Sequence, residues 1–102
     1  MTKFKDINIE AAKSLMQKKT VALADIRDLD SYNTGHIEGA VHVTNDNLQD
    51  FIQNSNLDQP LIVYCFHGHS SQPAAQFLLE QGFEEAYSLI GGYTLWASEH
   101  SG

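Results

Sequence analysis

Residues 60–82, "PLIVYCFHGHSSQPAAQFLLEQG", join an apolar run to a helical pattern through a short polar turn. The run at residues 60–65 is the most apolar in the chain and predicts a buried, central strand. The pattern at residues 70–82 predicts a helix, with Pro73 in its first turn and Gly82 as its C-terminal stop. We expect this helix to turn four apolar side chains inward: Ala74, Ala75, Phe77 and Leu78.

Three further apolar segments predict strands: residues 20–27, which end as a strand near Asp25, residues 41–44 and residues 85–90. They alternate with segments that we expect to be helical, and strands separated by helices imply crossover connections. The sequence therefore predicts an α/β fold over residues 1–102, as a single domain. Its core is a central parallel β-sheet of four to five strands flanked by helices on both faces.

Four segments carry the helical or turn patterns between these strands. Residues 7–19 predict a helix capped by Asn8, and residues 45–55 and 91–100 predict two more. The inward face of the first helix is expected to contain Ile9, Ala12, Leu15 and Met16. Residues 28–40, "DLDSYNTGHIEGA", are rich in turn formers, with one helical turn around Tyr32.

Charge and composition exclude several classes of function. The net charge is −7, and the chain contains no Lys or Arg after Arg27. Nucleic acid is therefore a poor partner, because backbone binding needs Lys and Arg to neutralise phosphates. No apolar run is long enough to span a membrane, and the first ten residues lack a hydrophobic signal region. We expect a cytoplasmic protein with no membrane partner.

Cys65 is the only cysteine, so an internal disulfide and a CxxC dithiol site are both excluded. It lies at the carboxyl end of the predicted central strand, where ligands bind in parallel sheets. Gly68 allows the following loop to curl so that its N–H groups point inward, and the next helix adds its positive N-terminus. These features favour a thiolate nucleophile with a lowered pKa over an inert core cysteine.

The sequence of the same loop argues against a phosphatase. Cysteine-dependent phosphatases close the loop with an arginine in a C-x5-R pattern, and that arginine's position is occupied here by Ser71. A phosphoryl dianion would therefore lack its bidentate clamp. The same argument disfavours an arsenate reductase.

Four fragments together resemble the rhodanese domain: "DIRD" at residues 25–28, "YNTGHIEGAVHV" at 32–43, "CFHGHSS" at 65–71 and "GGYTLW" at 91–96. The resemblance covers essentially the whole chain and is closest to small single-domain bacterial sulfurtransferases. It implies transfer of sulfane sulfur through a Cys65 persulfide, with no cofactor. The implied donor is thiosulfate or another sulfane-sulfur compound. The implied acceptor is cyanide, a low-molecular-weight thiol or a thioredoxin-like protein.

The resemblance also implies roles for the loop residues. Backbone N–H groups from Phe66 to Ser70, Gly68 among them, are expected to bind the negative sulfur. Ser70 and Ser71 are candidate hydroxyl donors, and Ser71 is equally a candidate helix cap. His67 and His69 are expected to line the rim and contact substrate. We expect no metal site, because ligands this close on a curled loop diverge.

The remaining fragments indicate structural roles. Asp25 and Arg27 are expected to form an ion pair that fixes the loops. Gly35, His36 and Gly39 fit turn chemistry, with His36 as a hydrogen-bonding residue. The residues expected to start and pack the last helix are Gly91, Gly92 and Trp96.

Many rhodaneses carry Arg or Lys in or just after the loop, where this chain has Phe66, His67, His69 and Gln72. This difference predicts weak binding of free thiosulfate. Two hypotheses therefore follow from the sequence: a thiosulfate sulfurtransferase, or a non-catalytic or persulfide-carrier module that acts with a partner protein. The retained cysteine favours the enzyme.

Overall fold

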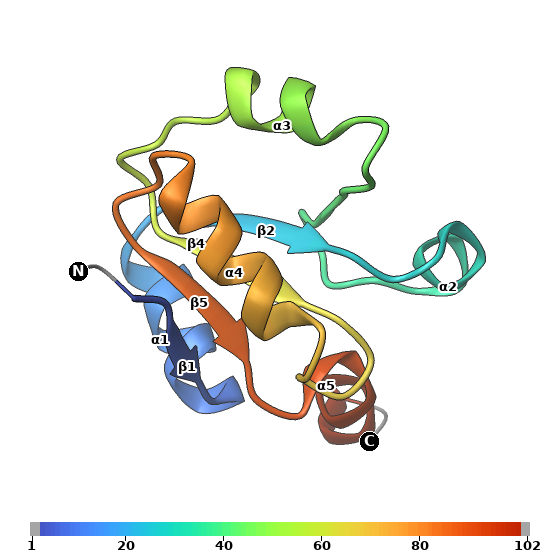
Figure 1. Ribbon diagram of the computed structural model, residues 1–102. Helices are drawn as coiled ribbons and strands as arrows, with labels where there is room; N and C mark the ends of the chain where they lie inside the picture. The colour runs from blue at the N-terminus through green and yellow to red at the C-terminus, as the bar shows by residue number, and fades with distance from the viewer. Residues whose placement is uncertain (1–2, 101–102) are drawn as a thin grey trace.

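The computed structural model describes residues 3–100, and over this range the fold is a five-stranded parallel sheet with helices on both faces (Figure 1). The strands are β1 (Lys5–Ile7), β2 (Ala22–Asp25), β3 (Val41–His42), β4 (Leu61–Tyr64) and β5 (Ala86–Leu89). Their order in the sheet is β1-β5-β4-β2-β3, and each neighbouring pair is parallel. The predicted fold class is confirmed, and β4 is the central strand, as its composition predicted.

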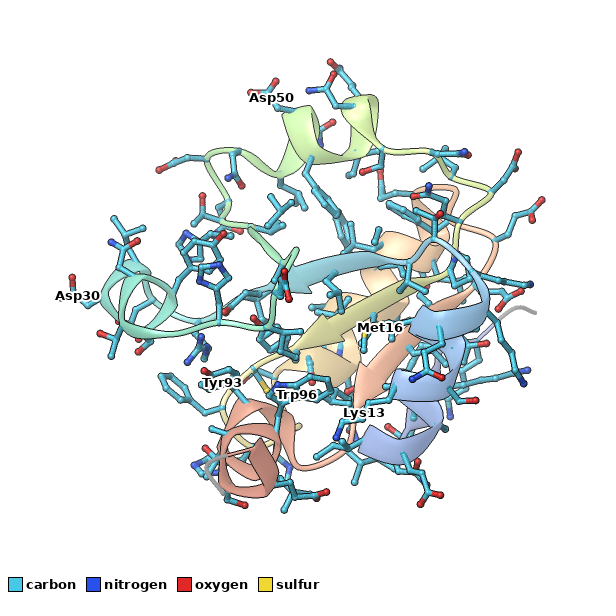
Figure 2. All side chains as sticks on the ribbon, turned by 180° about the vertical axis from the view of Figure 1, so that it is seen from behind. Lys13, Met16, Asp30, Asp50, Tyr93 and Trp96 are labelled. Atoms are coloured by element: carbon cyan, nitrogen blue, oxygen red, sulfur yellow. The ribbon has the colours of Figure 1, made fainter. Side chains whose placement is uncertain are left out.

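Five helices connect and cover the strands: α1 (Ile9–Lys18), α2 (Leu29–Thr34), α3 (Leu48–Asn54), α4 (Ser71–Glu80) and α5 (Gly92–His100). Helix α4 lies across one face of β4 and β5 (Figure 1). Helices α1 and α5 cover the other face, where Lys13 and Trp96 lie next to each other (Figure 2). The Lys13 ammonium is 5.5 Å from the centre of the Trp96 ring. Within residues 3–100 no helix is long and apolar enough to cross a membrane.

The two faces of β4 contribute to two separate apolar cores. Ile62 and Tyr64 pack with α1 on one side, whereas Leu61 and Val63 pack with α4 on the other. Successive side chains of a strand point to opposite faces, so a strand covered on both sides must be apolar throughout. All four side chains of β4 are fully buried. Because β4 is also the central strand, Cys65 lies near the middle of the carboxyl edge of the sheet.

The expected N-terminal helix and its cap at Asn8 are confirmed, and only Ile7, the first residue of the predicted segment, lies outside the helix and its caps. The Asn8 side chain caps it by accepting a hydrogen bond from the Ala11 N–H, at 2.7 Å. Ile7 instead belongs to β1, an edge strand that the sequence analysis missed. Because β1 is three residues long and buries only Ile7, it gives no recognisable alternation. Strand β3 is also shorter than predicted, with two residues instead of four.

One inward side chain of α4 was predicted wrongly. Phe77 is 41% exposed, whereas Leu79 is buried. The buried residues of α4 lie at spacings that trace one stripe of a 3.6-residue helix; they are Ser71, Ala75, Leu78 and Leu79. Phe77 falls outside this stripe and lines an open, mainly apolar groove of about 640 Å³ between α4 and residues 43–48.

Phe83 and Phe77 together test the apolar core that lies between α4 and the sheet. Phe83 is 2% exposed and stacks on Phe51, with ring centres 6.0 Å apart. We expect Phe83→Ala to lower the free energy of unfolding by about 3–5 kcal/mol, because it leaves a cavity. Phe77→Ala, the matched control, should lower it by less than about 1 kcal/mol. Urea unfolding measures both, and equal losses would contradict the assignment of Phe83 to the core.

Candidate functional site

Cys65 follows the last residue of β4 and lies between the ends of the neighbouring strands β2 and β5. Its side chain is 6% exposed. Residues 66–70 form a loop that begins at the cysteine and leads directly into α4. The thiol is therefore held at the carboxyl edge of the sheet, with a short loop and a helix N-terminus beside it.

The sulfur of Cys65 is surrounded by hydrogen-bonding groups. The Gly68 N–H donates to Sγ at 3.2 Å, and the Ser71 hydroxyl lies 3.4 Å from it. Burial raises the pKa of the Cys65 thiol, but the Ser71 side chain and the N–H groups of Ser71, Gly68 and His67 outweigh burial. As a result, the pKa of Cys65 lies below the ordinary value of a cysteine thiol. The site therefore favours the thiolate, the form of cysteine that acts as a nucleophile.

Gly68 lets the loop curl, as expected, and its φ of +93° is a conformation that glycine adopts readily. However, Gly68 is buried, although the rest of the loop lies at the surface. A Cβ atom at this position would lie 3.0 Å from both the Leu89 carbonyl oxygen and the Gly91 nitrogen. Glycine is therefore required twice, for the backbone conformation and for the close packing of the loop on the turn that follows β5.

The first turn of α5 holds the other side of the loop. The N–H groups of Tyr93 and Thr94 donate to the carbonyl oxygens of Cys65 and Phe66, at 2.8 and 3.0 Å. A Cβ atom at Gly92 would lie 2.5 Å from each of these two oxygens. Gly92 starts α5, as predicted, but it also lets the helix approach the cysteine loop. The sequence analysis did not foresee this contact, which joins segments about 27 residues apart.

The other loop side chains lie outside this packed region. Four of them are exposed: Phe66, His67, His69 and Ser70. We call the exposed surface of this loop the mouth of the site. Ser70 precedes α4 but makes no side-chain cap. Among residues 3–100, no group of three His, Cys, Asp or Glu side chains is arranged to hold a metal ion.

Ser71 is not the helix cap that one of our alternatives proposed. Its side chain is fully buried and its hydroxyl faces the sulfur of Cys65. The same hydroxyl is 2.7 Å from the Ser88 hydroxyl on β5. Sequence reasoning missed Ser88. The only available signal was a serine within the otherwise apolar strand pattern of residues 86–89.

Asp25 and Arg27 form the expected ion pair, with Arg27 Nη2 2.7 Å from Asp25 Oδ2. Arg27 also donates to the Gly35 carbonyl oxygen at 2.6 Å. The guanidinium carbon lies 4.1 Å from the centre of the Tyr93 ring and 5.5 Å from that of Phe66. Burial lowers the pKa of Arg27, but Asp25 more than compensates, so its pKa is raised and it stays charged. The positive charge is balanced inside the protein and ties α2 to α5.

His36 and Gly39 lie in the segment between α2 and β3, as expected for turn residues. His36 Nδ1 is 2.8 Å from the Tyr32 carbonyl oxygen, and its ring stacks on that of Tyr32 at 3.9 Å. Gly39 has φ of +87°, and a Cβ atom there would meet nothing within 4 Å. Neither residue has a contact to the sulfur among the described interactions. Their arrangement is consistent with a structural role.

Comparisons with known proteins identify the family and agree with the fold. Residues 8–99 match the family model described as a rhodanese-like domain. The chain is 47% identical over 96 residues to thiosulfate sulfurtransferase GlpE of Shewanella oneidensis, covering 94% of this chain and 95% of that protein. It is also 47% identical over 98 residues to thiosulfate sulfurtransferase GlpE of Pseudoalteromonas translucida, covering 96% and 93%.

Solved structures show the same fold at lower identity. A rhodanese-related protein from Thermoplasma volcanium matches with a TM-score of 0.78 and 22% identity, over 94% of this chain and 93% of that one. A rhodanese-like domain protein from Staphylococcus aureus matches with a TM-score of 0.78 and 23% identity, over 91% of each chain. The chain therefore belongs to the rhodanese-like domain family, and its enzyme class is that of the sulfurtransferases.

The approach of α5 to the cysteine loop can be tested at Gly92. We expect Gly92→Ala to lower the free energy of unfolding by more than about 2 kcal/mol, because the new methyl group meets two carbonyl oxygens. Gly39→Ala is the matched control: its φ is also positive, but the space around it is open. It should cost only about 1 kcal/mol of conformational strain.

Amide hydrogen exchange separates a local effect from a global one. In Gly92→Ala the Tyr93 and Thr94 amides should exchange faster than in Gly39→Ala, because they lose their carbonyl partners in the loop. Equal costs and equal exchange in the two variants would contradict the role given to Gly92.

Proposed function

We propose that this protein transfers sulfane sulfur from thiosulfate through a persulfide on Cys65. The observation that carries the proposal is the set of donors around the sulfur, which lowers the pKa of Cys65 despite its burial. The names of the relatives support thiosulfate as the donor. We place the reaction in the cytosol, where thiol acceptors are kept reduced.

The first step is attack by the Cys65 thiolate on the outer sulfur of thiosulfate. A new S–S bond forms to Cys65, the S–S bond of thiosulfate breaks, and sulfite leaves with the bonding electron pair. In the second step an acceptor attacks the outer sulfur of the persulfide and restores the thiolate. Cyanide then gives thiocyanate, whereas a small thiol or a thioredoxin-like protein takes the sulfur as its own persulfide.

The backbone of the loop supplies the electrostatic stabilisation in this mechanism. N–H donors held in place by folding need no reorganisation when negative charge develops on sulfur. Gly68 fixes one such donor, and the α4 N-terminus contributes the Ser71 N–H and hydroxyl. No side-chain cation is required at the sulfur itself. The lowered pKa of Cys65 also makes it a better leaving group in the second step.

The mouth of the site favours acceptors with some apolar surface. Phe66 is 43% exposed and lies directly beside the cysteine in the chain. An exposed phenylalanine at this position offers contact area to a thiol carrier and nothing to an inorganic anion. We therefore propose a thiol, small or protein-borne, as the physiological acceptor, with cyanide as an assay substrate.

The alternative is a rhodanese-fold module that binds a partner or carries a persulfide without turnover. A pure binding module has no need for a thiolate surrounded by donors, which favours the enzyme. Steady-state formation of thiocyanate from thiosulfate and cyanide separates the two. Turnover supports the enzyme; a single stoichiometric burst without turnover supports the carrier.

Formation of the persulfide is the most direct test of the chemistry. After incubation with thiosulfate and removal of excess reagent, the intact chain should gain the mass of one sulfur atom. Cys65→Ser should abolish both this adduct and thiocyanate formation, because the chain has no other thiol. Circular dichroism should show that the variant keeps its fold. Residual turnover by folded Cys65→Ser would overturn the proposal.

A second test concerns the charge at the mouth. Arg27 is paired with Asp25, so the loop binds thiosulfate without a free cation of its own. We expect Gln72→Lys, next to Ser71 in the first turn of α4, to lower the KM for thiosulfate by about fivefold at low salt. The gain should shrink as salt is raised above about 0.15 M, because salt screens exposed charges.

The matched control is Gln49→Lys, which adds the same charge on α3. It should leave the KM nearly unchanged at every salt concentration. The Gln72 side chain already lies 3.5 Å from the Asp6 carboxylate, so the new lysine will be shared between Asp6 and the substrate. Tight thiosulfate binding in the natural protein, unaltered by Gln72→Lys, would contradict this view of the mouth.

A further inference from the structure

Two buried hydroxyl groups continue from the sulfur of Cys65 as a chain of close polar contacts. Ser71 Oγ is 3.4 Å from Cys65 Sγ and 2.7 Å from Ser88 Oγ. Ser71 and Ser88 are both 0% exposed. They come from different elements, the first turn of α4 and the middle of β5. Ser88 Oγ, Ser71 Oγ and Cys65 Sγ are thus linked in series between β5, α4 and the end of β4.

A fully buried serine in a central region of a sheet needs a hydrogen-bond partner, because an unpaired buried hydroxyl is costly. Among the described residues, the hydrogen-bond partner of the Ser88 hydroxyl is Ser71. The register neighbours of Ser88 are Val63 on β4, which is apolar, and Asp6 on β1, whose carboxylate accepts from the Gln72 side chain. The hydroxyl of Ser88 is therefore directed at Ser71 and, through it, at Cys65.

Counting hydrogens shows what this arrangement can do. When Cys65 is a thiol, its S–H donates to Ser71 Oγ, and the Ser71 O–H is free to donate to Ser88. When Cys65 is a thiolate, the sulfur has no hydrogen and can only accept. The Ser71 O–H must then point at the sulfur, and the lone pairs of Ser71 need a new donor. Ser88 is placed to be that donor.

We propose that Ser88 is a positioning residue for Cys65: its hydroxyl donates to Ser71 and thereby holds the Ser71 hydroxyl toward the negative sulfur. Ser88 does not touch the sulfur and acts only through Ser71. Hydrogen bonds in such a chain polarise one another, so the second hydroxyl strengthens the first. The inference rests on the proposed function in one respect, that Cys65 is the nucleophile.

The pH dependence of Cys65 alkylation tests this role without any sulfur donor. Iodoacetamide reacts with the thiolate, so the midpoint of the rate profile reports the pKa of Cys65 directly. We expect Ser88→Ala to move this midpoint up by about half a pH unit, which is about a threefold loss of rate below the midpoint. Ser55→Ala removes a hydroxyl that bonds to the Phe51 carbonyl oxygen on α3 and should leave the midpoint unchanged.

Action through Ser71 is tested by combining two substitutions. Ser71→Ala alone should raise the midpoint by more than Ser88→Ala does, because it removes the group in contact with sulfur. Adding Ser88→Ala to Ser71→Ala should then raise it no further. A shift of undiminished size in the Ser71→Ala background would overturn the proposal, since Ser88 would then act by another route.

A pair of isosteric substitutions distinguishes an effect of the Ser88 hydroxyl on Cys65 from a role of Ser88 in packing alone. Ser88→Thr and Ser88→Val have the same shape and the same crowding in the core, but only the threonine keeps the hydroxyl. The midpoint of Ser88→Val should lie above that of Ser88→Thr by about as much as the midpoint of Ser88→Ala lies above that of the natural protein. The proposal would be overturned if Ser88→Thr and Ser88→Val had equal midpoints, and Ser88→Ala had that of the natural protein. Differences in urea unfolding alone would then mean that Ser88 only packs in the core. This readout remains valid even if the protein fails to turn over thiosulfate.

Discussion

The close contact between the cysteine loop and the first turn of α5 is the constraint on which the site depends. Two backbone N–H groups of α5 donate to the carbonyl oxygens of Cys65 and Phe66. Such a contact requires that no side chain stand between the two segments, and Gly92 and Gly68 meet that requirement. Because these two carbonyls are bound to α5, the start of the loop is fixed in the conformation in which the Gly68 N–H donates to the sulfur. Backbone packing therefore positions the N–H donors of the loop, and the Ser71 hydroxyl completes the donor set.

Burial of the sulfur has opposing effects. A thiol removed from water resists ionisation, and this raises its pKa. Gly68, Ser71 and the helix start offset the penalty with directed donors, so the net pKa is lowered. In the proposed reaction the same donors serve the thiolate and the persulfide anion, because both place negative charge on sulfur at the mouth of the loop. In our proposal the Ser88 hydroxyl supports these donors from within the core, because it donates to Ser71.

Charge is used sparingly around the site. The one arginine of the chain is committed to Asp25 and to the Gly35 carbonyl oxygen. Its guanidinium packs against Tyr93 and Phe66, so it links α2, α5 and the loop mechanically. Oriented dipoles thus replace fixed cations at the sulfur, and an exposed phenylalanine replaces them at the rim.

The sequence alone determined the features that depend on short-range patterns. The apolar run before Cys65 predicted the central strand, Asn8 predicted the helix cap, and Gly68 predicted a loop that can curl. Other features depended on which segments meet in space. The β1 edge strand exists only because β5 lies beside it, and Phe77 faces outward because the sheet sets the rotation of α4. The contact of Gly92 with the loop and the pairing of Ser71 with Ser88 join residues 17 or more positions apart. No local pattern encodes such distances, so tertiary packing alone decided them.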